Sequence, residues 1–222
     1  MIPEIVHQLW IDPHGQRGSG LPPDIERNRA AWRTFHKSFQ FRVWQPDDLL
    51  RLCEAHERPE IAAAIMACRF PAMQADLGRL LVLELFGGFW IDLRLHPLVP
   101  FLDQLLSCDL VVTEHFPKDN LPEPNGFLIN GFIGAAPAHP CIRAALRSVA
   151  ENVARRMSGS IFYVTGSTNL LKAVQAASDR GAFRMLGHRE TWGRLFELRG
   201  GSYNAGGMHW SERQERESPY RD

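Results

Sequence analysis

The segment of residues 73–95 constrains the fold more than any other part of the chain. Residues 73–86 form an apolar, helix-favouring run that is followed at once by the pair Gly87-Gly88. Glycine adopts the left-handed conformations at which helices end, so this pair predicts a helix stop. In residues 89–95, apolar side chains alternate with others that include Asp92, which is the period of a strand. A helix that leads directly into a strand indicates an α/β domain.

Other segments show the period of strands or helices in alternation along the chain. Strands are predicted at 5–11, 39–44, 109–113 and around 131–135, and helices at 22–35, 49–56, 60–69, 137–156 and 169–177. This order predicts a single α/β domain over residues 1–210 with a mainly parallel central sheet. Residues 211–222 are polar with little to bury, so we expect a frayed tail.

The charge balance and the cysteines exclude several classes of protein. The chain has 222 residues with 25 Lys+Arg and 25 Asp+Glu, and a protein without a basic surplus is not expected to bind nucleic acid. Its four cysteines lie far apart without a histidine at zinc spacing, which favours reduced core thiols. No apolar run approaches the roughly 18 residues of a membrane span, and no secretion signal opens the chain. We therefore expect a cytoplasmic protein.

Two pairs of opposite charges lie at the centre of this predicted unit. Asp76 and Arg79 are three residues apart on the helix, and Asp92 and Arg94 are two apart on the strand, so each pair shares a face. Taken singly, Asp76 and Arg79 form an ordinary surface ion pair worth about 0.3 kcal/mol, and Asp92 and Arg94 form a salt bridge on a half-exposed sheet face. Taken together, a helix that ends in a glycine pair and a strand that finishes in an acidic residue indicate the carboxyl edge of a parallel sheet, where α/β folds bind ligands. A diphosphate bound there needs a metal or an arginine to neutralise its charge.

Three segments of the chain resemble one enzyme family. They are the opening strand at 2–11, the acidic-then-arginine helix at 75–79, and the glycine pair with its aspartate at 87–92. They are similar to the D-x-D glycosyltransferases of the mannosyltransferase-like type (family 32, related to Golgi initiating mannosyltransferases). A more distant likeness is to the glucosylating domains of large bacterial toxins. The match is good over residues 2–100 and loose beyond them.

The resemblance implies a fold and a reaction. The fold is the GT-A type, a Rossmann-like sandwich that binds a nucleotide sugar. The reaction is the retaining transfer of a hexose from a nucleoside diphosphate sugar to a saccharide or other hydroxyl acceptor. In relatives such enzymes serve polysaccharide biosynthesis or decorate glycans.

The resemblance also implies roles for individual residues. Trp10 or Ile11 would lie against the nucleotide base, and Asp92 would orient the donor and meet a divalent cation, Mn or Mg. The residues implied to bind the donor are Trp10, Ile11, Asp76, Arg79, Asn130 and His209. His209 belongs to a carboxyl-terminal His/Trp segment that closes over the diphosphate in relatives, with a solvent-facing histidine as the other interpretation.

Arg94 departs from the family, which has a metal-binding carboxylate at this position. In one interpretation the guanidinium neutralises the leaving diphosphate, and catalysis does not need metal. In the other, Arg94 ties up Asp92 in a salt bridge. The chain is then a degenerate, non-catalytic domain that binds nucleotide sugar or a partner protein. A third possibility is that Glu114 completes a metal site.

Two dipeptides before predicted elements have local interpretations. Asn130-Gly131 is predicted to form a turn, because both residues tolerate positive φ. The alternative, from the resemblance, is a hydrogen bond from Asn130 to the donor sugar. Ser167 or Thr168 is predicted to cap the helix that follows.

The remaining histidines carry weaker expectations. Glu114 and His115 follow a predicted strand, and a carboxylate–imidazole pair there would suit an acceptor site. His7 and His96 are predicted to be structural histidines with satisfied hydrogen bonds.

Overall fold

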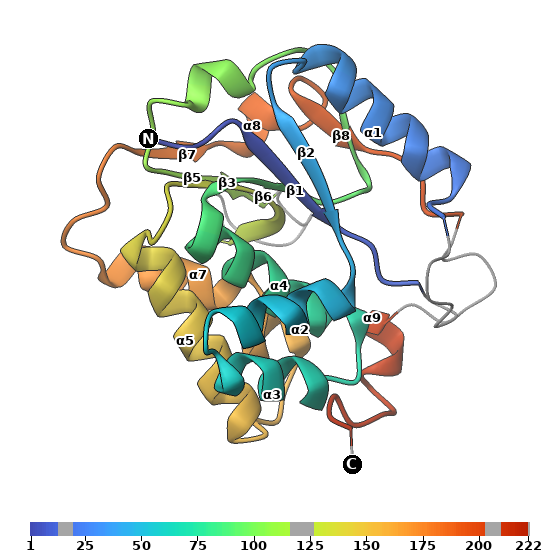
Figure 1. Cartoon of the computed structure of the whole chain (residues 1–222), viewed down its shortest axis with the longest axis vertical. Coiled ribbons are helices and arrows are strands. Elements are labelled where there is room, and N and C mark those ends of the chain that lie inside the picture. The colour runs from blue at the N-terminus through green and yellow to red at the C-terminus, as the bar shows by residue number, and fades with distance from the viewer. Residues whose placement is uncertain (13–19, 116–126, 203–209, 222) are drawn as a thin grey trace.

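A six-stranded sheet forms the centre of the computed structural model, which describes residues 1–12, 20–115, 127–202 and 210–221 (Figure 1). The strand order is β2-β1-β3-β6-β5-β7. Their bounds are β1 Ile5–Leu9, β2 Gln40–Trp44, β3 Gly88–Ile91, β5 Leu110–Glu114, β6 Leu128–Ala135 and β7 Phe183–Leu186. Only β6 runs against its neighbours β3 and β5, and the other pairs are parallel. The predicted α/β fold with a mainly parallel sheet is confirmed.

Helices cover both faces of the sheet. The larger ones are α1 Pro23–Phe35, α2 Pro46–Ala55, α3 Pro59–Ala67, α4 Pro71–Phe86, α5 Pro140–Ala154 and α7 Ser167–Ala176. Short turns of helix are α6 Ile161–Val164, α8 His188–Thr191, α9 Trp210–Arg213 and a 3₁₀ turn at Leu102–Leu105. Figure 1 shows α2, α3, α4, α5 and α7 on one side of the sheet and α1 on the other. In β3, Trp90 packs into the core below α4, while Phe89 and Ile91 join the core beneath α1.

The glycine pair is required both by helix α4 and by strand β3. Gly87 and Gly88 have φ of +63° and +92°, which favour glycine and end the helix. A Cβ atom on Gly88 would lie 2.5 Å from the carbonyl oxygen of Ile5, so only glycine lets β1 approach β3 this closely. The predicted stop and strand start are confirmed.

The predicted strand at 89–95 is wrong beyond Ile91. The amide of Leu95 donates to the carbonyl oxygen of Asp92 at 2.9 Å, so the chain turns at residues 92–94. It then forms β4, Leu95–Pro97, which pairs antiparallel with β8, Phe196–Leu198, in a separate two-stranded sheet. Asp92 and Arg94 therefore do not share the face of one strand.

The Asn130-Gly131 turn is also wrong, since both residues lie inside β6. Along β5, the neighbours Val112 and Thr113 pair with Ile133 and Ile129, so β6 bulges between these two partners. Neither Asn130 nor Gly131 adopts the positive φ on which the turn prediction rested.

The last described residues are packed against the helices rather than frayed. Tyr220 is 4% exposed and forms an isolated bridge with Cys68 at the end of α3. On either side, the Arg69 amide donates to the Pro219 carbonyl and the Arg221 amide to that of Ala67, each at 2.8 Å. The Tyr220 ring and these backbone bonds dock the segment, together with a bond from the Ile161 amide to Gln214 Oε1 at 3.0 Å. In the part of the chain that the structure describes, no helix is long and apolar enough to cross a membrane.

Candidate functional site

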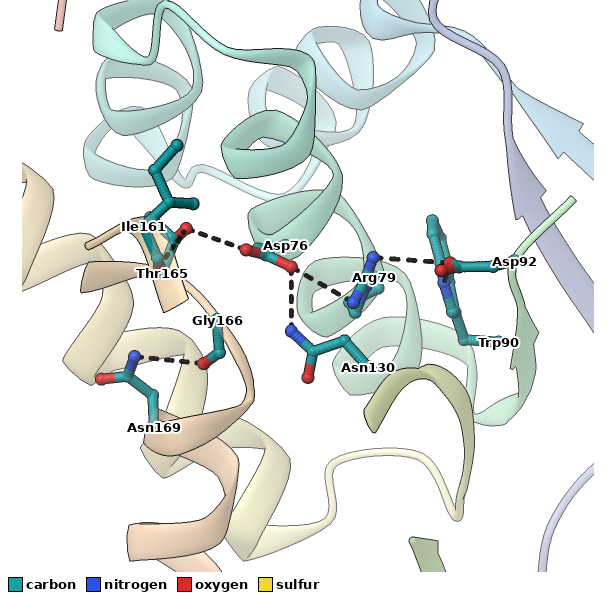
Figure 2. A network of polar contacts seen from close by, with 9 residues as sticks. All are labelled: Asp76, Arg79, Trp90, Asp92, Asn130, Ile161, Thr165, Gly166 and Asn169. Carbon is teal, nitrogen blue, oxygen red and sulfur yellow. Dashed lines mark hydrogen bonds and ion pairs between the residues drawn. The ribbon is translucent and has the colours of Figure 1, made fainter. Parts of the chain in front are cut away.

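A buried arginine joins two carboxylates where β3 ends (Figure 2). Arg79 comes from α4, and its Nη1 lies 3.2 Å from Asp76 Oδ1 one turn before it. Its Nη2 lies 3.4 Å from Asp92 Oδ1, directly after β3. The guanidinium is also placed over the Trp90 ring, 5.3 Å from its centroid, and Arg79 is 5% exposed. The structure thus brings together the predicted donor residues Asp76, Arg79 and Asp92.

Asp76 is engaged at both carboxylate oxygens. Its Oδ1 accepts from Asn130 Nδ2 at 2.9 Å in addition to Arg79, and its Oδ2 accepts from Thr165 Oγ1 at 2.8 Å. Burial raises the pKa of Asp76, while Arg79, Thr165 and Asn130 act to lower it. Asp76 therefore holds α4, β6 and the residues before α7 together around Arg79.

Among the described residues, Asp92 has one carboxylate oxygen without a hydrogen-bond partner. Its Oδ1 accepts from Trp90 Nε1 at 2.7 Å and lies beside Arg79, while the side chain is 43% exposed. Its Oδ2 faces Gly131, where a Cβ atom would lie 3.2 Å away. The Asp92 amide donates to the Gly131 carbonyl at 2.8 Å, which fixes the turn against β6. Oδ2 is thus held in place to accept a hydroxyl or to bind a cation.

Arg94 has a different environment from Arg79. It is half-buried, its Nε is buried without a hydrogen-bond partner, and it forms no ion pair with any residue that the structure describes. Its guanidinium lies against Gly201, where a Cβ atom would be 3.3 Å from Nε. The salt bridge between Arg94 and Asp92, one of the two interpretations of Arg94, is not formed, and the cation next to Asp92 is Arg79.

Trp10 and Ile11 extend from β1 towards the same turn. Trp10 is 6% exposed and packs with Ile25 and Leu93, the middle residue of the turn. Ile11 is partly exposed. The indole is placed beside the candidate site, but its ring is mostly covered by protein. His209 lies outside the described residues, so its role as a ligand stays a prediction.

Glu114 pairs with a histidine that the sequence did not single out. Its Oε2 lies 3.2 Å from His188 Nδ1 and accepts from the His188 amide at 3.3 Å. The predicted partner His115 follows Glu114 in the chain, but α8 brings His188 to the carboxyl end of β5 instead. Among the described ranges, no three His, Cys, Asp or Glu side chains are grouped closely enough to hold a metal ion.

The start of α7 contains hydroxyls without partners. Gly166 occupies the N-cap position, and no side chain caps the helix, so the predicted capping by Ser167 or Thr168 is wrong. Both hydroxyls are buried without a hydrogen-bond partner, close to the Thr165 that binds Asp76. Buried hydroxyls are usually bonded, so these two are exceptions among the described residues.

The two histidines predicted to be structural are confirmed as such. His7 Nε2 lies 2.9 Å from the Gly87 carbonyl, and its Nδ1 accepts from Trp44 Nε1 at 3.2 Å. Burial lowers the pKa of His7 to about 4, so the ring is neutral at pH 7. His96 Nδ1 bonds Asn28 Oδ1 at 3.1 Å, and burial also lowers its pKa.

Comparison with known proteins gives likenesses both in sequence and in fold. No protein-family model matches the chain. An uncharacterized glycosyltransferase of Acanthamoeba polyphaga mimivirus is 24% identical over 140 residues, which are 63% of this chain and 52% of that protein. The chain thus spans about half the length of this curated relative. Among solved structures, PaToxG glycosyltransferase shares the fold with a TM-score of 0.53 and 12% identity, over 78% of this chain and 69% of that one.

Proposed function

We propose that the chain is a retaining glycosyltransferase that moves a hexose from a nucleoside diphosphate sugar to a saccharide or other hydroxyl acceptor. The observation that carries this proposal is the unequal use of two arginines. Arg79 is neutralised between two carboxylates, whereas Arg94 is a half-buried cation without a carboxylate partner among the described residues. A cation in that state favours an anionic ligand, and a diphosphate matches the guanidinium geometry.

The likenesses to glycosyltransferases in sequence and in fold support the same reaction class. A cytoplasmic location, one domain over residues 1–210 and a role in polysaccharide biosynthesis are further parts of the proposal.

The proposed step assigns a task to each free group. The acceptor oxygen forms a bond to the anomeric carbon while the bond from that carbon to the diphosphate oxygen breaks. The electron pair leaves with the diphosphate, which takes the acceptor proton, and attack on the same face retains the configuration. Arg94 stabilises the negative charge that develops on the diphosphate. Asp92 Oδ2 accepts a hydrogen bond from a hydroxyl of the sugar donor. Asp76 and Arg79 keep Asp92 in position.

The described residues do not provide a cation site by themselves. Asp92 Oδ2 is the free carboxylate oxygen here, because both oxygens of Asp76 are bonded within the protein. A divalent ion takes about six oxygen ligands and would need most of them from the diphosphate and water. The proposed step therefore uses Arg94 and Asp92 and does not include Mn or Mg.

One observation favours a second candidate function. The same shortage of free carboxylates suits a non-catalytic domain that binds nucleotide sugar, or a partner protein, without turnover. The two functions differ in whether nucleoside diphosphate is released.

The test is release of nucleoside diphosphate from a panel of nucleotide sugars, each with manganese, magnesium or a chelator. Release that survives the chelator supports an enzyme in which Arg94 replaces the metal. Binding by calorimetry without release supports the non-catalytic domain. Arg94→Asp separates them further, since manganese-dependent release that appears only in the variant would identify a degenerate metal site.

A further inference from the structure

Helix α1 holds the turn at 92–94 through one buried amide. Asn28 is 2% exposed, and its Nδ2 donates to the carbonyl oxygens of Leu93 and Arg199, each at 3.0 Å. Its Oδ1 lies 3.1 Å from His96 Nδ1. Both protons and the oxygen of this amide are thus used, and each connects α1 to a segment more than sixty residues away.

The second of these segments, residues 199–202, lies over Arg94. The Arg199 amide donates to the Arg94 carbonyl at 2.8 Å. Gly201 has φ of +124°, and its α-carbon faces the Arg94 guanidinium so closely that a Cβ would lie 3.3 Å from Nε. The side chain of Arg94 is therefore confined by packing and by backbone bonds rather than by a carboxylate.

Asp24, one turn before Asn28 on α1, fixes the far end of the same segment. Its carboxylate accepts from the amides of Gly201 and Ser202 at 2.8 and 3.0 Å, and from Ser202 Oγ at 2.8 Å. The hydrogen bonds from Ser202 hold the pKa of Asp24 well below its usual range. Two side chains of one helix therefore set the position of residues 199–202.

We propose that Asn28 is a positioning residue for the transfer reaction. It sets the place of Arg94 by binding the turn and the covering segment to α1 at once. The inference rests on the proposed function, in which Arg94 meets the diphosphate. A charge aimed at a transition state must be placed within a fraction of an ångström, and loss of the amide frees both segments that confine it.

The test is a double-mutant cycle between Asn28→Ala and Arg94→Ala, measured as kcat/KM for nucleoside diphosphate release. Asn28→Ala is expected to lower kcat/KM roughly tenfold in the native chain, mainly through kcat, and less than about twofold when Arg94 is already alanine. An equal factor in both backgrounds would overturn the inference. Should Asn28→Ala not fold, Asn28→Ser keeps one donor and takes its place in the cycle.

Gln74→Ala is the matched control. Gln74 is 7% exposed and its Nε2 donates to the Cys68 carbonyl at 3.0 Å, so this variant also loses a buried amide bond. Gln74→Ala is expected to lower the melting temperature about as much as Asn28→Ala does. It should change kcat/KM by the same factor whether or not Arg94 is present. A purely structural role for Asn28 would give this additive pattern.

A second readout does not depend on turnover. Hydrogen exchange at the amides of residues 199–202 is expected to quicken at least tenfold in Asn28→Ala and to stay unchanged in Gln74→Ala. If the native chain releases no nucleoside diphosphate, the proposed function fails. Hydrogen exchange, and calorimetry with nucleoside diphosphates, still test whether Asn28 positions Arg94. Unchanged exchange and unchanged affinity in Asn28→Ala would overturn the inference by themselves.

Discussion

Arg79 and Arg94 lie on either side of Asp92 and are held in opposite ways. Arg79 is enclosed between two carboxylates and an indole ring, so its charge is neutralised inside the protein. Arg94 is confined by a turn and by the backbone at Gly201, and no described carboxylate neutralises it. The two arginines therefore have different roles. Arg79 stabilises the structure of the site, and Arg94 is available to a ligand.

The largest effect is expected from Asp76→Ala. Removing one partner of a buried charge pair commonly destabilises a protein by about 3–5 kcal/mol, and here Arg79, Asn130 and Thr165 would all lose a partner. We expect a loss of about 3 kcal/mol in the free energy of unfolding by denaturant titration, together with loss of any turnover. Thr165→Val removes a hydroxyl that donates to Asp76 at 2.8 Å and lies 3.4 Å from the Ile161 carbonyl oxygen, and it should cost about 1 kcal/mol. An equal loss of unfolding free energy in Asp76→Ala and Thr165→Val would contradict the role of Asp76 as the shared partner of this network.

Arg94→Ala should show the reverse pattern. We expect kcat for nucleoside diphosphate release to fall roughly 100-fold, as when one donor to a developing negative charge is removed. The free energy of unfolding should change by less than about 1 kcal/mol, because no ion pair among the described residues is lost. Arg51→Ala is the control: it removes only an exposed ion pair with Asp48, so it should leave kcat unchanged and alter the free energy of unfolding by less than about 0.5 kcal/mol. A stability loss as large as that of Asp76→Ala would erase the distinction between the two arginines.

Acid should lower the free energy of unfolding through His7, which binds Gly87 at the end of α4. The folded pKa is about 4 against 6.5 in the unfolded chain, because burial disfavours the charged ring. Between these two pKa values the unfolded chain binds more protons than the folded chain. The stability that the neutral His7 contributes is therefore complete above pH 6.5 and declines as pH falls to about 4. It amounts to at most about 3 kcal/mol.

Denaturant titrations of the native chain and of His7→Gln across this range provide the measurement for His7. The difference between the two chains should shrink towards low pH. A difference that is constant with pH would contradict a neutral His7.

The smallest effect is expected from Gly131→Ala. The new Cβ would lie 3.2 Å from Asp92 Oδ2, so that carboxylate must shift by a few tenths of an ångström. We expect affinity for a nucleotide sugar to weaken about threefold by calorimetry, with less than about 1 kcal/mol lost in stability. Gly20→Ala, where a Cβ meets nothing within 4 Å, is the matched control. Unchanged affinity for the nucleotide sugar would show that Asp92 Oδ2 does not bind the donor.

The parts of this site that sequence reasoning predicted are those with local signals. Asp76 and Arg79 share a helical face, and Gly87-Gly88 ends that helix, so α4 and the start of β3 are confirmed. The turn at 92–94 was missed because Leu93 and Leu95 are both buried, in separate clusters, which imitates the alternation of a strand.

Contacts between distant segments left no such signal. Thr165 reaches Asp76 across 89 residues, and Asn28 reaches Leu93 across 65. A threonine before a helix and an asparagine within one have many local uses, so neither indicates its partner. Strand β7 was also missed, since three of its four residues are at least partly exposed and its composition is mixed.

Burial makes the four thiols chemically unequal, and at Cys68 part of the cover comes from the segment around Tyr220. Cys53, Cys68 and Cys141 are buried, and burial raises the pKa of Cys68 to about 12 and of Cys53 to about 11, so few thiolates form there. A reagent in solution therefore meets the partly exposed Cys108 first. We expect Cys68 to become reactive when the residues around Tyr220 detach, so that its rate of alkylation would report how often residues 219–221 leave the helices.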